Sequence, residues 1–327
     1  MKKFINSVDD LVHDSVAGLV SAHEDLLALN ESPLFVCRRT PKQSRVALVS
    51  GGGSGHEPLH TGYVGFGMLD AACPGNVFTA PTPDQIVAAC ERVDAGPGVL
   101  MIVKNYAGDC ASFQVAAEML EMECATVLVN DDVAVEHSTH TTGRRGVAGT
   151  LIVEKMIGAA AEAGADLYEC KSLGGRVNAS TASMGVALTS CTVPEADAPT
   201  FAIDAQEIEV GVGIHGEPGR YRRTLMPADA IVKLLLEPIL QDLRLAAGSV
   251  VLLHVNGFGG TPLSELHLLS GIATRQLRGH GLDVKRWLVG NYTTSLEMAG
   301  ASITLTALDD ELTALWDAPV ITPSLRW

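Results

Sequence analysis

The sequence is poor in aromatic side chains and in positive charge, and these two deficits argue against whole classes of partner. Phenylalanine, tryptophan and tyrosine make up 5% of the 327 residues, so few rings are present on which nucleic-acid bases could stack. Lysine and arginine number 23 against 38 aspartates and glutamates, which gives a formal charge of −15. Because basic residues also form no long run, we expect no nucleic acid and no anionic membrane as partner.

The sequence also lacks paired-cysteine motifs, a signal peptide pattern and an uncharged apolar span. The seven cysteines are odd in number and form no Cys-x-x-Cys motif, which is typical of reduced thiols in a cytoplasmic protein. Two lysines near the N-terminus are not followed by an apolar stretch, because two aspartates interrupt it, so we expect no signal peptide. The longest apolar span, 147–163, carries three charged side chains and therefore predicts a core helix and not a membrane span.

Glycine is abundant instead, and two glycine clusters each contain a histidine. His56 lies in Gly51-Gly-Gly-Ser-Gly-His-Glu-Pro58, and His215 lies in Gly213-Ile-His-Gly-Glu-Pro-Gly219. Glycines let the backbone close on a small ligand, and an imidazole there can act as base, acid or nucleophile near neutral pH. The alternative for each cluster is a tight turn that contains a histidine by chance.

Apolar runs alternate with helical patterns along the chain. Strands are expected at 46–50, 99–104, 125–130, 207–214, 249–255, 284–289 and 302–308, and helices at 83–93, 111–123, 147–163, 228–246, 263–279 and 309–316. Continuous apolar strands between helices are typical of parallel sheets covered on both faces. We therefore predict an α/β protein of two α/β domains, 1–186 and 187–327, with largely parallel or mixed sheets covered by helices. The stretch 173–198, rich in small residues, supplies the boundary.

A third candidate site follows the strand predicted at 99–104. Ligands of α/β sheets bind beyond the carboxyl ends of strands, and this strand leads into Lys104-Asn-Tyr-Ala-Gly-Asp109. Asp109 could accept a hydroxyl proton or orient a histidine, and Lys104 could bind a hydroxyl or a phosphate. The alternative, which spacing alone favours, is that Asp109 caps the helix that follows.

The glycine clusters do not match the standard nucleotide-binding signatures. The first lacks the Gly-Lys-Ser/Thr ending of a P-loop, and Gly211-x-Gly213-x-x-Gly216 runs into a proline and a glycine where a dinucleotide-binding helix should begin. His137 and His140 lie three residues apart without an evident third ligand, so we interpret them as part of a polar loop in preference to a metal site.

Four further polar residues have open or secondary roles. His60 lies close enough in sequence to His56 to support it, whereas His254 falls in a predicted strand and is interpreted as a core or edge histidine. Arg144 and Arg145 either clamp an acidic partner or pair within the fold, and the sequence alone leaves both alternatives open.

Further motifs extend the three candidate sites over nearly the whole chain. They are Phe78-Thr-Ala-Pro-Thr-Pro-Asp-Gln85, Asn130-Asp-Asp-Val-Ala-Val135, Gly143-Arg-Arg-Gly-Val147, Val255-Asn-Gly-Phe-Gly-Gly-Thr-Pro262 and the terminal Thr322-Pro-Ser-Leu-Arg-Trp327. With these motifs in this order and spacing, the chain resembles the substrate-binding K subunit of dihydroxyacetone kinases, especially the phosphotransferase-system-dependent type.

The resemblance implies a role for each candidate residue. His215 would add to the ketone of dihydroxyacetone and hold it as a covalent hemiaminal, while His56 would act as general base on the hydroxyl to be phosphorylated. Asp109 would help to activate or orient that hydroxyl. The implied substrate contacts are Gly53, Ser54, Gly55 and Lys104, together with His56, Asp109 and His215.

The resemblance also implies what this chain leaves to others. No cofactor or metal is expected on it, and ADP (or ATP) with Mg would be carried by a separate L subunit, which an M subunit fed by the phosphotransferase system would recharge. The chain would form a homodimer in the cytoplasm. Physically, this subunit would position the hydroxyl, and its partner would stabilise the moving phosphoryl group.

Departures from the family pattern leave the substrate open. Ala80 stands where relatives often have serine, and Ala107-Gly-Asp-Cys-Ala-Ser112 replaces bulkier variants around Asp109. A kinase subunit for a related short ketose such as erythrulose is therefore one alternative, and a ketose-sensing regulatory protein is another. Retention of both His56 and Asp109 favours catalysis, because capture alone would need only His215.

Overall fold

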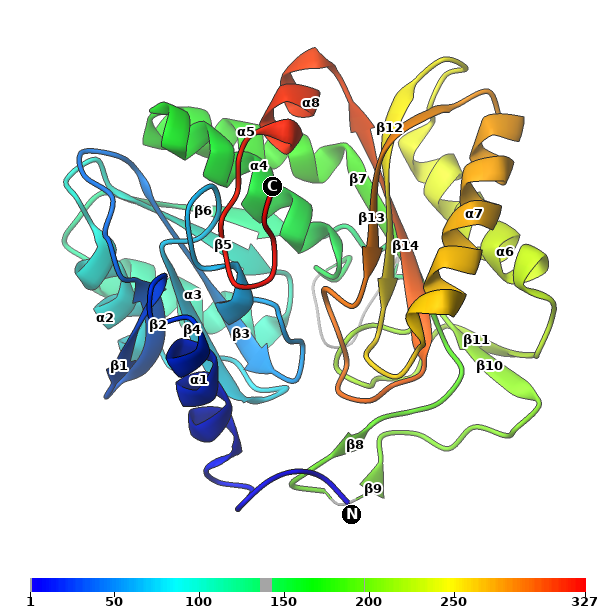
Figure 1. Ribbon diagram of the computed structural model, residues 1–327, viewed down its shortest axis with the longest axis horizontal. Coiled ribbons are helices and arrows are strands. Elements are labelled where there is room, and N and C mark those ends of the chain that lie inside the picture. The colour runs from blue at the N-terminus through cyan, green and yellow to red at the C-terminus, as the bar shows by residue number, and fades with distance from the viewer. Residues whose placement is uncertain (1, 136–142, 197) are drawn as a thin grey trace. The chain divides into compact units, whose positions relative to one another are not determined.

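The computed structural model describes residues 2–135, 143–196 and 198–327 (Figure 1). It divides into two compact units, each assembled from separate stretches of the chain. The first consists of Met1–Val129, Ile152–Arg176 and Ala314–Trp327, and the second of Asn130–Leu151 and Val177–Thr313. This division is not the predicted single break, because each unit contains residues from both sides of position 186, and that position falls inside strand β7 (Thr181–Ala187). The chain instead passes between the units more than once.

The first unit is built on a six-stranded sheet with the order β1-β2-β4-β3-β5-β6. Its strands are β1 (Leu27–Glu31), β2 (Leu34–Arg38), β3 (Ala47–Ser54), β4 (Ala71–Val77), β5 (Val99–Lys104) and β6 (Cys124–Val129). The four strands from β4 to β6 run parallel, and β1 and β2 add an antiparallel edge. The carboxyl ends of β3 and β5 therefore lie at the same edge of this sheet.

The helices of the first unit pack against the side chains that the strands direct to the faces of the sheet. They are α1 (Leu11–Ala22), α2 (Pro83–Val93), α3 (Ala107–Met119), most of α4 (Gly149–Ala163) and of α5 (Leu167–Ala179), and the short η1 (Thr61–Tyr63). Val49 and Met101 pack with Ile86 of α2 and Phe113 of α3 in one core. Successive strand residues point to opposite faces, so the neighbouring side chain of Ser50 is directed to the other face.

The second unit contains a mixed sheet with the order β11-β10-β7-β14-β12-β13. Its elements are β7, β10 (Glu207–Val210), β11 (Tyr221–Thr224), α6 (Ala228–Leu243), β12 (Val250–Gly257), α7 (Leu263–Gly279), β13 (Asp283–Gly290), β14 (Gly300–Leu308) and the first half of α8 (Asp310–Asp317), with the short pair β8 (Thr192–Val193) and β9 (Ala198–Pro199). The β12–β13 pair is parallel, and the other neighbours are antiparallel. The predicted α/β class with mixed sheets is confirmed.

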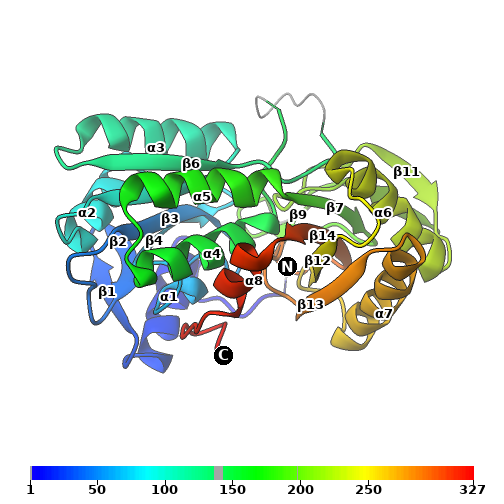
Figure 2. The same ribbon diagram turned by 90° about the horizontal axis from the view of Figure 1, so that it is seen from above.

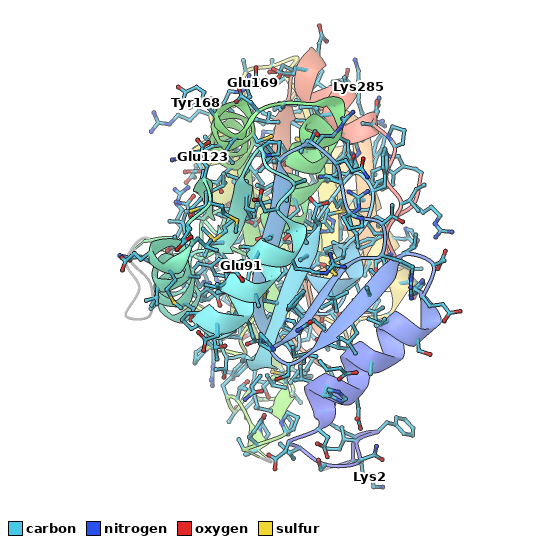
Figure 3. The ribbon with its side chains drawn as sticks, turned by 90° about the vertical axis from the view of Figure 1, so that its left-hand side faces the viewer. Lys2, Glu91, Glu123, Tyr168, Glu169 and Lys285 are labelled. Atoms are coloured by element: carbon cyan, nitrogen blue, oxygen red, sulfur yellow. The ribbon has the colours of Figure 1, made fainter. Side chains whose placement is uncertain are left out.

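Helix α5 and strand β7 were not predicted, because their small residues resemble a boundary. In β7 the glycine has a packing role, since a Cβ at Gly185 would lie 3.0 Å from the Phe258 ring. In α5 the buried Leu167, Cys170 and Val177 repeat with helical spacing. Figure 3 shows Tyr168 projecting from this helix, and the residue is 79% exposed. Figure 2 shows α5 beside α4.

Candidate functional site

The end of β3 leaves room for a lysine from the neighbouring strand. Lys104 is the last residue of β5, and its side chain is completely buried. A Cβ at Gly52 would lie 2.1 Å from the Lys104 Nζ atom, so only a hydrogen fits at that position. The glycine cluster is therefore required for the close approach of a cation to the strand end.

Lys104 has three partners around its ammonium group. Nζ lies 3.2 Å from the carbonyl oxygen of Gly51 and 2.9 Å from Nε2 of His60. It also forms an ion pair of 3.3 Å with Oδ2 of Asp109. The sequence predicts that Lys104 and Asp109 belong to one site, and the structure brings them together. His60, for which the sequence suggests only a supporting role, is a further member.

Asp109 is a buried carboxylate inside the first turn of α3. The helix begins at Ala107, and its N-cap is Tyr106, so Asp109 does not take the capping position considered above. Burial raises the pKa of the Asp109 carboxyl, and the Lys104 charge opposes that rise. A carboxylate with a raised pKa accepts a proton more readily, which fits a group that activates or orients a hydroxyl.

His56 lies in a loop that its own glutamate holds. The backbone N–H of Gly55 donates to both carboxylate oxygens of Glu57, at 3.1 and 3.0 Å. The His56 ring is fully buried and stacks on Phe78, with ring centroids 5.2 Å apart and planes inclined by 17°. The imidazole is therefore held in a defined orientation just beyond the end of β3.

A further carboxylate, Glu154 of α4, belongs to this cluster and was missed. Its Oε1 atom lies 2.6 Å from Nδ1 of His60, and the Glu154 side chain has no exposed area. Burial raises the pKa of Glu154 to about 8, against the opposing effect of Lys104. Burial also lowers the pKa of His60 well below its ordinary value, and the charge of Lys104 acts in the same direction. The available signal was a glutamate within the apolar span 147–163.

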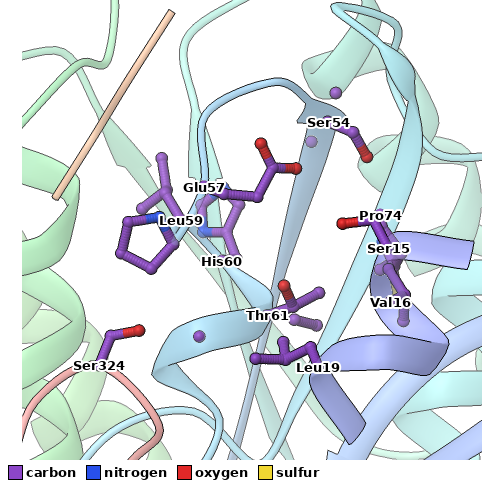
Figure 4. Close-up of a pocket in the computed structure, with 16 residues that line it drawn as sticks. Ser15, Val16, Leu19, Ser54, Glu57, Leu59, His60, Thr61, Pro74 and Ser324 are labelled. Atoms are coloured by element: carbon purple, nitrogen blue, oxygen red, sulfur yellow. The ribbon is translucent and has the colours of Figure 1, made fainter. Parts of the chain in front are cut away.

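A pocket of about 370 Å³ in the first unit opens beside this cluster (Figure 4). Its lining includes Gly53 and Ser54, two of the predicted substrate contacts, together with His60. Side chains of α1, Ser15, Val16 and Leu19, line another part of it. The Ser54 hydroxyl donates a hydrogen bond of 2.7 Å to the carbonyl of Gly75, so this serine is held in place at the strand end.

His215 lies in the second unit, on the loop between β10 and β11, and is partly buried. Its backbone N–H donates to Oε2 of Glu217 at 2.8 Å. The other oxygen of Glu217 accepts from Nη1 of Arg145 at 2.9 Å. A Cβ at Gly213 would lie 2.0 Å from that same oxygen, so glycine is required here for the carboxylate to approach the loop.

Arg145 connects the His215 loop to the rest of the second unit. Its Nε donates to Asp132 at 2.7 Å, and its Nη2 donates to the carbonyl of Gly211 at 2.8 Å. Arg144 pairs with Asp242 through two hydrogen bonds. Of the two alternatives for these arginines, the structure shows pairing within the fold.

The predicted site residues are divided between the units. Gly53, Ser54, Gly55, His56, Lys104 and Asp109 belong to the first unit, and His215 belongs to the second. The structure joins Lys104 and Asp109 directly. That His215 acts together with these groups stays a prediction.

The remaining polar candidates do not form a metal centre among the described residues. No group of three or more histidine, cysteine or acidic side chains placed to hold an ion occurs there, and His137 and His140 lie outside the described ranges. His254 is buried in β12, where its Nδ1 lies 3.0 Å from the Leu288 carbonyl, and burial lowers its pKa to about 4. It is a core histidine, as predicted.

Within the described ranges, no helix has both the length and the apolarity needed to cross a bilayer. All seven cysteines are free thiols. The pKa of several of these thiols is raised by burial, that of Cys90 to about 12, which does not favour the thiolate form that nucleophilic chemistry requires.

Comparison with known proteins gives consistent matches over almost the whole length. Residues 17–324 match the Dak1 domain. The chain is 50% identical to the dihydroxyacetone-binding subunit DhaK of PTS-dependent dihydroxyacetone kinase 1 from Listeria innocua, over 95% of each chain. It is 46% identical to the corresponding subunit of the PEP-dependent dihydroxyacetone kinase of Escherichia coli, covering 100% of this chain and 99% of that one. Among solved structures, the dihydroxyacetone kinase operon co-activator DhaQ superimposes with a TM-score of 0.90 at 32% identity, over 95% and 97% of the two chains.

Proposed function

The chain belongs to the Dak1 family, and on that premise we propose that it is the dihydroxyacetone-binding subunit of a dihydroxyacetone kinase. It binds the ketone and presents one hydroxyl for phosphorylation to dihydroxyacetone phosphate. The observation that carries the proposal is the ion pair of Lys104 with Asp109, buried at the glycine-rich end of β3. This arrangement offers a small hydroxylated substrate an ammonium donor and a carboxylate acceptor in one place.

Capture of the substrate is assigned to His215. A ring nitrogen adds to the carbonyl carbon, the electron pair of the C=O double bond moves to the oxygen, and that oxygen takes a proton while the ring releases one. The product is a hemiaminal, and no oxidant or reductant is consumed. Covalent capture selects short ketoses and aldoses over glycerol, which has no carbonyl. The hydrogen bond from the backbone N–H of His215 to Glu217 supports this role, because it fixes the backbone that carries the nucleophile.

Phosphorylation is assigned to the groups of the first unit. His56 takes the proton of the attacking hydroxyl, and Asp109 orients that hydroxyl, so the oxygen becomes a nucleophile. The phosphoryl group comes from ATP with Mg on a separate L subunit, and the ADP that remains there is recharged by a phosphotransferase-system M subunit. The chain itself acts as a homodimer and contributes orientation, while its partner stabilises the transferred group.

The test combines turnover with detection of the adduct. The full chain is mixed with L and M subunits, or with ATP and an L-type domain, and phosphorylation of dihydroxyacetone and of erythrulose is followed. We expect turnover with dihydroxyacetone in the wild type. The His56→Ala variant should keep the adduct, seen by intact mass under non-denaturing conditions without a reducing agent, and lose turnover. The His215→Ala variant should lose the adduct.

A regulatory function is the second candidate, because the fold is shared with the co-activator DhaQ. A sensor would form the adduct at His215 but would not transfer a phosphoryl group with any donor. Turnover that survives in His56→Ala would contradict the assignment of the general base, and absence of turnover with every donor would reject the kinase function in favour of the sensor.

A further inference from the structure

A row of buried polar side chains reaches the Lys104–Asp109 pair from the interior of the first unit. It runs from Glu154 on α4 through His60 to Lys104, and Ser50 of β3 lies beside it. The distances are 2.6 Å from Glu154 Oε1 to His60 Nδ1 and 2.9 Å from His60 Nε2 to Lys104 Nζ. All of these side chains are at most 5% exposed. The proposed chemistry uses neither His60 nor Glu154, so the row needs its own explanation.

The hydrogen-bond partners determine where the imidazole proton of His60 lies. An ammonium group has three donors and no acceptor, so the contact with Lys104 requires Nε2 of His60 to be the acceptor. In a neutral imidazole the proton is then on Nδ1, which donates to Glu154. Ser50 lies 3.0 Å from the same Nδ1, but its hydroxyl hydrogen is directed to the carbonyl of Ile102 at 2.7 Å, so it faces His60 as an acceptor.

We propose that His60 is a positioning residue for Lys104: Glu154 holds its Nδ1–H tautomer, and the free Nε2 holds the Lys104 ammonium against Asp109. The Lys104 Nζ atom is then hydrogen-bonded to the Gly51 carbonyl and to Nε2 of His60, and it forms an ion pair with Oδ2 of Asp109. The ammonium group therefore has one defined position. The effect on turnover rests on the proposed function, whereas the tautomer itself does not.

The charges around the row are consistent with this assignment. Glu154 Oε2 has no hydrogen-bond partner among the described residues, and burial raises the pKa of this carboxyl to about 8. At neutral pH Glu154 is thus mostly a neutral acid whose Oε1 still accepts from His60. The lowered pKa of His60 keeps the imidazole neutral. The Lys104 cation is then balanced by Asp109, so the charges within this row are paired.

The first experiment observes the tautomer directly. Nitrogen-15 NMR of the full chain, with the His60 signals assigned by their loss in a His60→Gln variant, should show a protonated Nδ1 and an unprotonated Nε2 near neutral pH. A proton on Nε2 would overturn the proposal. This result does not depend on kinase activity, so failure of the proposed function would leave it interpretable.

The second experiment separates positioning from packing by paired substitutions. In His60→Gln an amide oxygen can still accept from Lys104, whereas in His60→Leu it cannot. Glu154→Gln and Glu154→Leu form the corresponding pair for the bond to Nδ1. We expect each leucine variant to lower kcat by about 100-fold with little change in KM, because a displacement of about 1 Å has that effect on rate, and each glutamine variant to stay within about tenfold of the wild type.

Formation of the His215 adduct and the thermal unfolding of each variant serve as controls for folding. A packing role predicts the opposite order, because leucine is at least as well accommodated as glutamine in a buried apolar space. Equal kcat values within each pair, or a fall that follows only the loss of stability, would therefore reject the positioning role.

Discussion

The two histidine loops use the same turn with the histidine in different places. In each loop the carboxylate of a Glu-Pro pair accepts the backbone N–H of the residue two positions before it. In the first loop that donor is Gly55, bonded to Glu57, so His56 lies inside the turn. In the second loop the donor is His215 itself, bonded to Glu217. A shift of one residue thus converts a histidine enclosed by the turn into one that begins it.

The surroundings of the two loops differ as much as the histidines do. His56 is fully buried against Phe78, whereas His215 is partly exposed. Glu57 directs both oxygens to Gly55, but Glu217 divides its oxygens between His215 and Arg145. An enclosed ring suits a base that must exclude water, and an accessible ring suits a nucleophile that must meet a carbonyl. The comparison predicts that a substitution outside both loops in the sequence, such as one at Arg145, disturbs the second loop more than the first.

The largest expected effect is that of Arg145→Met. This change removes the partner of two carboxylates, Asp132 and Glu217, of which Asp132 is buried, and breaking such a buried pair costs roughly 3–5 kcal/mol. Urea unfolding should show this loss of free energy, and adduct formation at His215 should fall with it. The matched control is Arg144→Met, whose pair with Asp242 is partly exposed and contributes about 0–1 kcal/mol. Equal losses in the two variants would contradict the anchoring role of Arg145.

The second prediction uses one glycine from each loop. Gly52→Ala places a methyl group against the Lys104 ammonium, and Gly213→Ala places one against the Glu217 carboxylate; overpacking of this kind costs about 1–3 kcal/mol. Gly52→Ala should lose turnover and keep the His215 adduct, while Gly213→Ala should lose the adduct. The control is Gly175→Ala in α5, where a Cβ has open space and should stabilise the helix by about 0.5–1 kcal/mol. The same pattern of turnover and adduct formation in both loop variants would contradict the proposal that the first loop serves phosphorylation and the second serves capture.

The sequence predicts the local parts of the site and not its long-range contacts. Lys104 and Asp109 could be assigned to one place because they follow a buried strand within a few residues. Glu154 could not, because it reaches His60 across 94 residues through the packing of α4 on the sheet. The contact of Arg145 with Glu217 spans 72 residues and likewise depends on the fold. The sequence does indicate that Glu154 has a partner, because a glutamate in an apolar helix needs a buried one.

The fold was predictable where periodicity and capping agree. Helix α2 has the predicted bounds because Thr82 and Gln85 form a capping box around its first turn. Strand β4 was missed because it contains Pro74 and Gly75, which argue against a central strand. Glycine is required at position 75, because a Cβ there would lie 2.0 Å from the Thr79 carbonyl oxygen. A requirement for close packing therefore overrides the local propensity.

The third prediction concerns the pH dependence of stability in the first unit. Folding raises the pKa of Glu154 from 4.5 to about 8, so between these values the folded state holds a proton that the unfolded state has lost. Stability therefore falls as pH rises through this window, by at most about 1.4 kcal/mol per pH unit for one proton. Glu154→Gln should remove this slope, and the difference between its unfolding curve and that of the wild type should change steadily from pH 5 to 8. Parallel stability profiles would show that Glu154 is ionised in the folded chain.

The smallest effect is expected for Glu57→Gln, compared with Glu217→Gln in the other loop. A glutamine oxygen still accepts the Gly55 N–H, so the first loop should lose less than about 1 kcal/mol and keep its turnover. Glu217→Gln removes the negative charge that pairs with the Arg145 guanidinium and leaves only a hydrogen bond to a neutral oxygen, so the His215 loop should loosen. Adduct formation measured against dihydroxyacetone concentration should weaken in Glu217→Gln and remain unchanged in Glu57→Gln. A weaker adduct in Glu57→Gln would mean that the first loop also takes part in capture, and that the two turns are not separated in function.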